Sequence, residues 1–206
     1  MSLKSLGLDY VDLYLMHWPS STDPSDPSLK THYSDWNFVD TWREMQKLPG
    51  TGKVKNIGVS NFAIKNLEKL LNDESCKTVP AVNQIELHPN NPSPKLVAYN
   101  KSKGIHSTAY SCLGSTDSPL YKNKTLIKIA EGKGKTVQQV LLQWGLQHEW
   151  SVIPKSVTES RIKANIELDR WELTQEEMKQ IDSMPERFKV CGDAWLPVKV
   201  FFGDDE

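Results

Sequence analysis

Polar and aromatic side chains follow the apolar runs of this 206-residue sequence, at the points where those runs end. The ends carry groups that can hydrogen-bond or stack on a ligand: His17-Trp18, Ser60-Asn61, Gln84 with Glu86 and His88, Tyr110-Ser111, and Lys155-Ser156. If the runs are parallel strands, their carboxyl ends meet on one rim, which is where α/β proteins bind ligands. The repetition, rather than any one pair, predicts a functional site.

His17 is the candidate for chemistry at a substrate. It is either a buried histidine satisfied by protein groups or, beside Trp18, a donor to a substrate oxygen. The other four histidines lack metal-ligand spacing with cysteines or carboxylates, and no Ser/His/Asp triad is evident. The sequence therefore predicts neither a metal centre nor a triad hydrolase.

Amide, hydroxyl and ring groups at three other ends suit a flat polar ligand. Ser60 and Asn61 either cap a helix or hydrogen-bond a carboxamide. Gln84 lies in an otherwise apolar strand, where a buried amide needs partners that a ligand amide could supply. Tyr110 is either a core aromatic or a face on which a ring stacks.

Two segments suit an anion. Residues 111–115 form a small-residue loop whose backbone N–H groups can meet phosphate. Within residues 154–161, two cations and two hydroxyls come together at the start of a helix: Lys155, Ser156, Thr158 and Arg161. Dipole, donors and charge favour phosphate there, and the alternative is a solvated helix start.

Bulk composition narrows the class of protein. The chain is 38% hydrophobic and 25% charged, as expected for one globular domain. A net charge of -1 gives no global field for nucleic acid or an anionic membrane, and no apolar run is long enough to span a bilayer. Three scattered cysteines favour a reducing, cytoplasmic location. Nothing in the sequence indicates a protein partner.

Strand patterns alternate with helix patterns five times. Strands are expected near residues 10–16, 54–59, 81–87, 105–110 and 151–153, and the first is expected to be buried on both faces. Helices are expected over 2–7, from 36 to 48, from Asn61, over 94–103, 125–131 and 136–148, after Thr158 and after Thr174. The order predicts a parallel sheet. No Gly-x-Gly-x-x-Gly follows a strand, so the expected fold is five-eighths of a (β/α)8 barrel.

Five segments carry a resemblance to a known family. They are residues 8–19 (LDYVDLYLMHWP), 52–62 (GKVKNIGVSNF), 82–89 (VNQIELHP), 109–111 (AYS) and 153–156 (IPKS). In this order they resemble the aldo-keto reductases, NADP(H)-dependent enzymes on a (β/α)8 barrel. Residues 192–206 are similar to fungal glycerol dehydrogenase-type members. The domain is expected to cover residues 1–206, with a tail from about 187.

The resemblance implies a role for each rim residue. His17 would orient the substrate carbonyl and Trp18 would line its pocket. Ser60, Asn61 and Gln84 would hold the nicotinamide carboxamide, and Tyr110 would stack on its ring. The pyrophosphate would meet Ser111, Leu113 and Ser115. The 2'-phosphate of NADP(H) would meet Lys155, Ser156, Thr158 and Arg161, and Asn165 would approach the adenine.

The sequence departs from the family in three places. Ala164 stands where many members have Glu, and Cys112 replaces a usual Pro. No segment matches the family's catalytic Tyr with its Asp and Lys, so an N-terminally truncated chain with impaired activity is expected. The resulting prediction is an NADP(H)-dependent oxidoreductase that reduces aldehydes or ketones to alcohols, with small hydroxy-aldehydes, hydroxyketones or polyols as the substrate class. The alternatives are a catalytically dead NADP(H)-binding or interaction module, or a product without function.

Overall fold

The strands form one sheet. A computed structural model describes residues 2–28 and 30–203. Its strands, in sheet order, are β1 (Val11–Met16), β2 (Val54–Ser60), β3 (Val82–Glu86), β4 (His106–Tyr110) and β5 (Ser151–Val152). The pairs β1/β2, β2/β3 and β4/β5 are parallel. The predicted α/β class with five strand–helix units is confirmed.

The chain divides into two compact units. Unit 1 comprises the described residues of Met1–Gln84, Pro94–Ser107 and Gly192–Glu206, and unit 2 comprises Ile85–Ser93 and Thr108–Cys191. The boundaries between the units fall within β3 and β4, so each unit contains part of both strands. A single domain over residues 1–206 stays a prediction.

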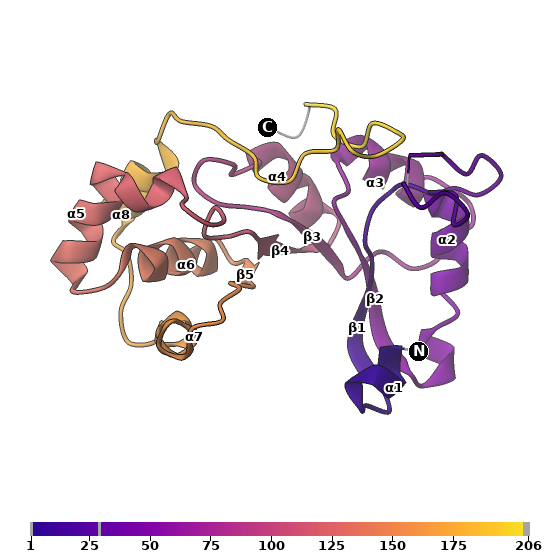
Figure 1. Ribbon diagram of the computed structural model, residues 1–206, viewed down its shortest axis with the longest axis horizontal. Helices are drawn as coiled ribbons and strands as arrows, with labels where there is room; N and C mark the ends of the chain where they lie inside the picture. The colour runs from indigo at the N-terminus through magenta and orange to yellow at the C-terminus, as the bar shows by residue number, and fades with distance from the viewer. Residues whose placement is uncertain (1, 29, 204–206) are drawn as a thin grey trace. The chain divides into compact units, whose positions relative to one another are not determined.

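Unit 1 carries β1, β2 and four helices. The helices are α1 (Ser2–Leu6), α2 (Phe38–Met45), α3 (Ile64–Leu71) and α4 (Pro94–Ser102), with a 3-10 turn η1 (Pro49–Thr51) before β2. The Asn37 side chain caps α2 by accepting from the Val39 N–H. The buried face of α2 includes Trp42, 1% exposed, whose indole N–H donates to the Thr78 carbonyl at 3.0 Å. Helices α2 and α3 pack together (Figure 1).

Strand β1 differs from the prediction. It was expected to be buried on both faces, but Asp12 and Tyr14 are exposed and alternate with half-buried residues. Alternate side chains of a strand point to opposite faces, and among the described residues β1 pairs only with β2. Lys55 salt-bridges Asp12 at 2.8 Å on this solvated face. Apolar composition alone did not reveal that one face is open.

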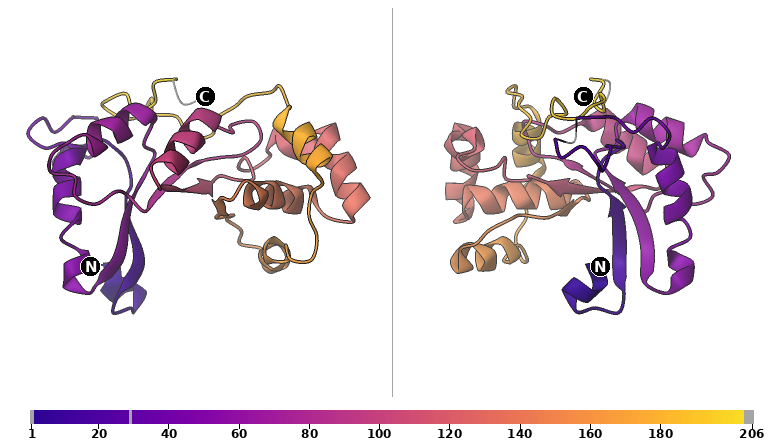
Figure 2. Two further views of the ribbon diagram at one scale, coloured as in Figure 1. Left: turned by 180° about the vertical axis from the view of Figure 1, so that it is seen from behind. Right: turned by 45° about the vertical axis from the view of Figure 1, so that its right-hand side comes forward.

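Unit 2 is mainly helical. Its helices are α5 (Lys124–Lys133), α6 (Val137–Gln147), α7 (Glu159–Ile166) and α8 (Gln175–Asp182), preceded by the 3-10 turn η2 (Pro119–Lys122). Capping boxes at Thr136 and Thr174 start α6 and α8, as predicted. Helix α5 packs on both α6 and α8, and Figure 2 shows the three together. Within the described ranges, no helix has the length and apolar character needed to cross a membrane.

Candidate functional site

In unit 1 the ends of three strands are tied together by rim residues. The Asn61 side-chain amide donates to the His17 backbone carbonyl at 2.9 Å. The Ser60 hydroxyl donates to the Gln84 backbone carbonyl at 2.8 Å. Parallel register explains the meeting, because Ser60 lies opposite Gln84 and Met16 opposite Val59. The structure therefore brings His17, Ser60, Asn61 and Gln84 to one edge.

Asn61 does not cap a helix. Helix α3 begins after Ala63, which makes no side-chain cap hydrogen bond, so the helix-cap alternative for Ser60 and Asn61 is wrong, as is the predicted start of the helix at Asn61. Asn61 instead takes a left-handed backbone with φ of 63°. Such a conformation costs energy in a residue other than glycine and persists where the surrounding contacts hold it. The strained turn directs the amide back across the rim toward β1.

The Gln84 side chain has an unused amide. Gln84 is half-buried, and no hydrogen bond from another described residue reaches its side chain. Its backbone is fixed by the Asn61 N–H, which donates to the Gln84 carbonyl at 3.0 Å. A half-buried amide held in place without a protein partner can donate to and accept from a ligand.

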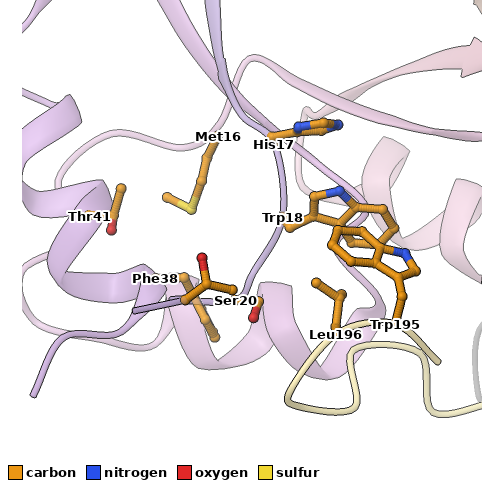
Figure 3. Close-up of a pocket in the computed structure, with 9 residues that line it drawn as sticks. Met16, His17, Trp18, Ser20, Phe38, Thr41, Trp195 and Leu196 are labelled. Carbon is orange, nitrogen blue, oxygen red and sulfur yellow. The ribbon is translucent and has the colours of Figure 1, made fainter. Parts of the chain in front are cut away.

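A pocket of about 330 Å³ opens beside His17 and Trp18. Figure 3 shows side chains from three parts of unit 1 around it. Its lining is Met16, His17, Trp18, Ser20, Thr22, Phe38, Thr41, Trp195 and Leu196. His17 is exposed rather than buried, so the buried-histidine alternative is wrong. The mixture of aromatic rings with hydroxyls and one imidazole suits a small, partly polar molecule.

The tail supplies a pocket wall, as expected from the sequence, but the residues that form this wall were not named there. Trp195 packs edge-on against Trp18, with ring centroids 5.4 Å apart, and Phe201 does so at 5.9 Å. The Asp193 carboxylate fixes this segment by accepting from the N–H groups of Val200 and Phe201, both at 2.9 Å. The aromatic residues of the tail are visible in the sequence, but they follow no helix or strand periodicity, so their positions could not be predicted. Phe38 and Thr41 were also missed.

In unit 2 the segment after β4 is tightly turned. Ser111 and Ser115 have positive φ angles of 46° and 69°, and Leu113 between them is half-buried. A Cβ at Gly114 would lie 2.3 Å from the Ser118 Oγ, so only glycine fits there. Burial, followed by the charges of Cys191 and Glu86, raises the pKa of the Tyr110 hydroxyl far above its ordinary range. Tyr110 is therefore a neutral ring.

The candidate phosphate residues also lie in unit 2. Lys155, Thr158 and Arg161 are exposed, and Ser156 and Asn165 are half-buried. Thr158 precedes α7 without capping it through its side chain, and its N–H donates to the Ser156 hydroxyl at 3.2 Å. The start of α7 thus offers free cations and a hydroxyl to an anion.

Tyr121 contacts the first anion segment, residues 111–115, and was missed from the sequence. Its hydroxyl donates to the Ser115 carbonyl at 3.3 Å. The charge of Arg161 lies near enough to lower its pKa, although burial is the larger effect and raises it overall. Tyr121 follows no strand, so the strand-end pattern could not find it. Across the described residues, no group of three His, Cys, Asp or Glu could hold a metal ion.

The arrangement is that of an α/β protein with ligand-type residues at the carboxyl ends of parallel strands. Comparison with known proteins makes the class specific: the chain belongs to the Aldo/keto reductase family, which matches residues 1–186. The resemblance seen in the sequence is confirmed. The fold is accordingly that of the family's (β/α)8 barrel, represented here by five strands.

Relatives with known names are similar over nearly all of this chain. It is 42% identical to "Glycerol 2-dehydrogenase (NADP(+))" of Saccharomyces cerevisiae, over 97% of this chain and 69% of that protein. It is 46% identical to "D-galacturonate reductase" of Hypocrea jecorina, over 99% and 68%. An aldehyde reductase of S. cerevisiae is 42% identical over 89% and 62%. The chain thus spans about two thirds of these relatives.

A solved structure shares the fold. The aldose reductase from Schistosoma japonicum superposes with a TM-score of 0.89 and 36% identity, covering 100% of this chain and 69% of that one.

Proposed function

We propose that this chain binds NADP(H) and serves the reduction of small aldehydes or ketones, including hydroxylated ones, to alcohols. The observation that carries the proposal is the rim of unit 1, where the Gln84 side-chain amide has no hydrogen-bond partner among the described residues and lies beside Ser60 and Asn61. These groups fit a planar carboxamide, because that ligand needs a donor and an acceptor in one plane. The cofactor would supply hydride, and the protein would supply orientation.

Residues of unit 2 support the phosphate half of the proposal. Lys155 and Arg161 are exposed cations that form no ion pair with another described residue, and they flank the Ser156 hydroxyl near the start of α7. They suit a doubly charged phosphate ester, which favours NADP(H) over NAD(H). Ser111, Leu113 and Ser115 would meet the pyrophosphate, Thr158 would assist at the phosphate and Asn165 would approach the adenine. Tyr110, a neutral ring, would stack on the nicotinamide.

His17 would orient the substrate carbonyl within the pocket lined by Trp18. Ser20, Thr22 and Thr41 add three hydroxyls to that lining, which suits a hydroxylated carbonyl compound. The relatives named for glycerol and galacturonate support this substrate class. The three cysteines are all free thiols, which supports a cytoplasmic location.

A second candidate function is NADP(H) binding without turnover. It is favoured by the pocket itself, because the described residues that line it include His17 but neither a tyrosine nor a lysine. A carbonyl reductase needs a proton donor near the oxygen as well as hydride at the carbon.

Two measurements test both candidates. Calorimetric titration of the chain with NADPH should show binding at least tenfold tighter than with NADH, and no heat from folded protein would refute both. NADPH consumption with glyceraldehyde or dihydroxyacetone then separates reductase activity from binding alone. Turnover supports the first candidate, and binding without turnover supports the second.

A further inference from the structure

A buried carboxylate in unit 2 holds the last residues of that unit in place. Glu86, at the end of β3, is 3% exposed. Its Oε1 accepts from the Val190 N–H at 2.6 Å and its Oε2 from the Cys191 N–H at 2.7 Å. His88 Nε2 lies 3.0 Å from the same Oε1. We call residues 188–191, with these contacts, the clamped segment.

The charge of Glu86 is maintained by these donors. Burial raises its pKa, but the hydrogen bonds from His88, Val190 and Cys191 together outweigh burial and lower it below the ordinary value. Hydrogen bonds to an ionised acceptor are about twice as strong as neutral ones. The clamped segment, which is neither helix nor strand, is therefore held by two strong hydrogen bonds to Glu86.

Ring stacking extends the same contact. Phe188 stacks on the fully buried His88, with centroids 4.6 Å apart and planes inclined by 28°. The Phe188 N–H donates to the Asn90 carbonyl at 3.0 Å. The clamped segment is therefore fixed at both ends, at Phe188 and at Cys191.

The clamped segment reaches Tyr110. The Leu87 N–H, next to Glu86, donates to the Tyr110 carbonyl at 3.4 Å. Burial raises the pKa of the Tyr110 hydroxyl most, and Cys191 and Glu86 lie near enough to raise it further. We propose that Glu86 is a positioning residue for the cofactor: it holds Cys191 against Tyr110 and so fixes the ring on which the nicotinamide stacks. This inference rests on the proposed NADP(H) binding and adds a residue to it.

The test compares Glu86→Gln with Glu131→Gln, a matched change at an exposed glutamate of the same unit. A glutamine keeps the shape but presents an NH₂ group to a backbone N–H. We expect the dissociation constant for NADPH to rise at least tenfold. That for 2',5'-ADP, which has the phosphate but no nicotinamide, should stay within twofold. Glu131→Gln should change neither.

The cysteines report the clamped segment directly. Alkylation followed by mass spectrometry should label Cys191 at least tenfold faster in Glu86→Gln, relative to half-buried Cys76, with Cys112 (3% exposed) unchanged. If Cys112 is also labelled, unit 2 has opened in Glu86→Gln. The variant Val190→Pro then takes the place of Glu86→Gln in the same test. Val190→Pro removes one N–H donor and leaves Glu86 intact.

Two results would overturn the inference while the wild type binds NADPH. One is unchanged NADPH affinity despite faster Cys191 labelling, and the other is an equal loss for NADPH and 2',5'-ADP. A folded wild-type chain that binds no NADPH would instead refute the proposed function.

Discussion

Replacing Asn83 by leucine should destabilise unit 1, because the Asn83 side chain hydrogen-bonds the backbone of Phe62, the residue that follows the strained turn at Asn61. Asn83 is fully buried; its amide donates to the Phe62 carbonyl at 2.9 Å and to Asn100 Oδ1 at 3.4 Å, and it accepts from the Phe62 N–H at 3.4 Å. Each buried group left without a partner costs about 1–3 kcal/mol. Burying the leucine offsets about 2 kcal/mol of that loss. Three groups lose their partner at about 1–3 kcal/mol each, so after this offset we expect a net loss of about 1–7 kcal/mol.

Urea unfolding followed by tryptophan fluorescence measures this loss, since Trp42 is buried in the same unit. The matched control is Asn56→Leu on β2. Asn56 is exposed, and its side-chain amide donates to the Asp12 carbonyl at 3.2 Å. We expect that control to stay within about 0.5 kcal/mol of the wild type. A loss below about 1 kcal/mol for Asn83→Leu, or equal losses for both variants, would refute the argument from stranded groups.

Three further predictions concern the cofactor, a thiol and a strand. Lys155→Met should raise the dissociation constant for NADPH about 10- to 100-fold and leave that for NADH unchanged, as measured by calorimetry; Lys163→Met, which removes a cation paired with Glu159, should change neither. Burial raises the pKa of Cys112 from 9.0 to about 11, so the unfolded state ionises first as pH rises. The contribution of the neutral thiol to the free energy of unfolding is therefore complete below pH 9 and is lost, by up to about 3 kcal/mol, toward pH 11. In urea unfolding at a series of pH values, the stability of Cys112→Ala should fall less steeply than that of the wild type. Parallel plots of stability against pH for the two proteins would contradict this. Gly58→Ala would place a Cβ 2.7 Å from the Val82 carbonyl oxygen and should lower stability by about 1–3 kcal/mol, whereas Gly50→Ala, with nothing within 4 Å, should not.

Local signals in the sequence predicted most of the element boundaries. Thr136 and Thr174 marked helix starts because a hydroxyl satisfies an N–H group of the first turn. Gly104 marked a helix end because it takes a left-handed backbone, with φ of 71°. Asn61 misled the same reasoning. It is a residue type that caps helices, but its amide bonds to His17, which is distant in the sequence.

The rim residues of unit 1 were predictable because parallel register needs only the strand ends. Once β1, β2 and β3 are recognised, their last residues must lie near one another. The far wall of the pocket was not predictable in this way. Thr41 faces the pocket from α2 and Trp195 from the tail, and both placements depend on contacts that no local period encodes.

The position of the tail depends on contacts with distant residues, which local sequence patterns do not reveal. A segment without helix or strand must still satisfy its backbone N–H groups. Glu86 does this for Val190 and Cys191, and Asp193 does it for Val200 and Phe201. Each carboxylate accepts from two successive N–H groups, so a single acidic residue fixes a short stretch of irregular chain. In the sequence such a residue is indistinguishable from a solvated acid. Glu86 gives one clue, since it follows Ile85 at the end of a largely buried strand, where an ionised side chain needs strong donors. An acidic residue within a buried strand therefore predicts that some irregular segment folds back onto it.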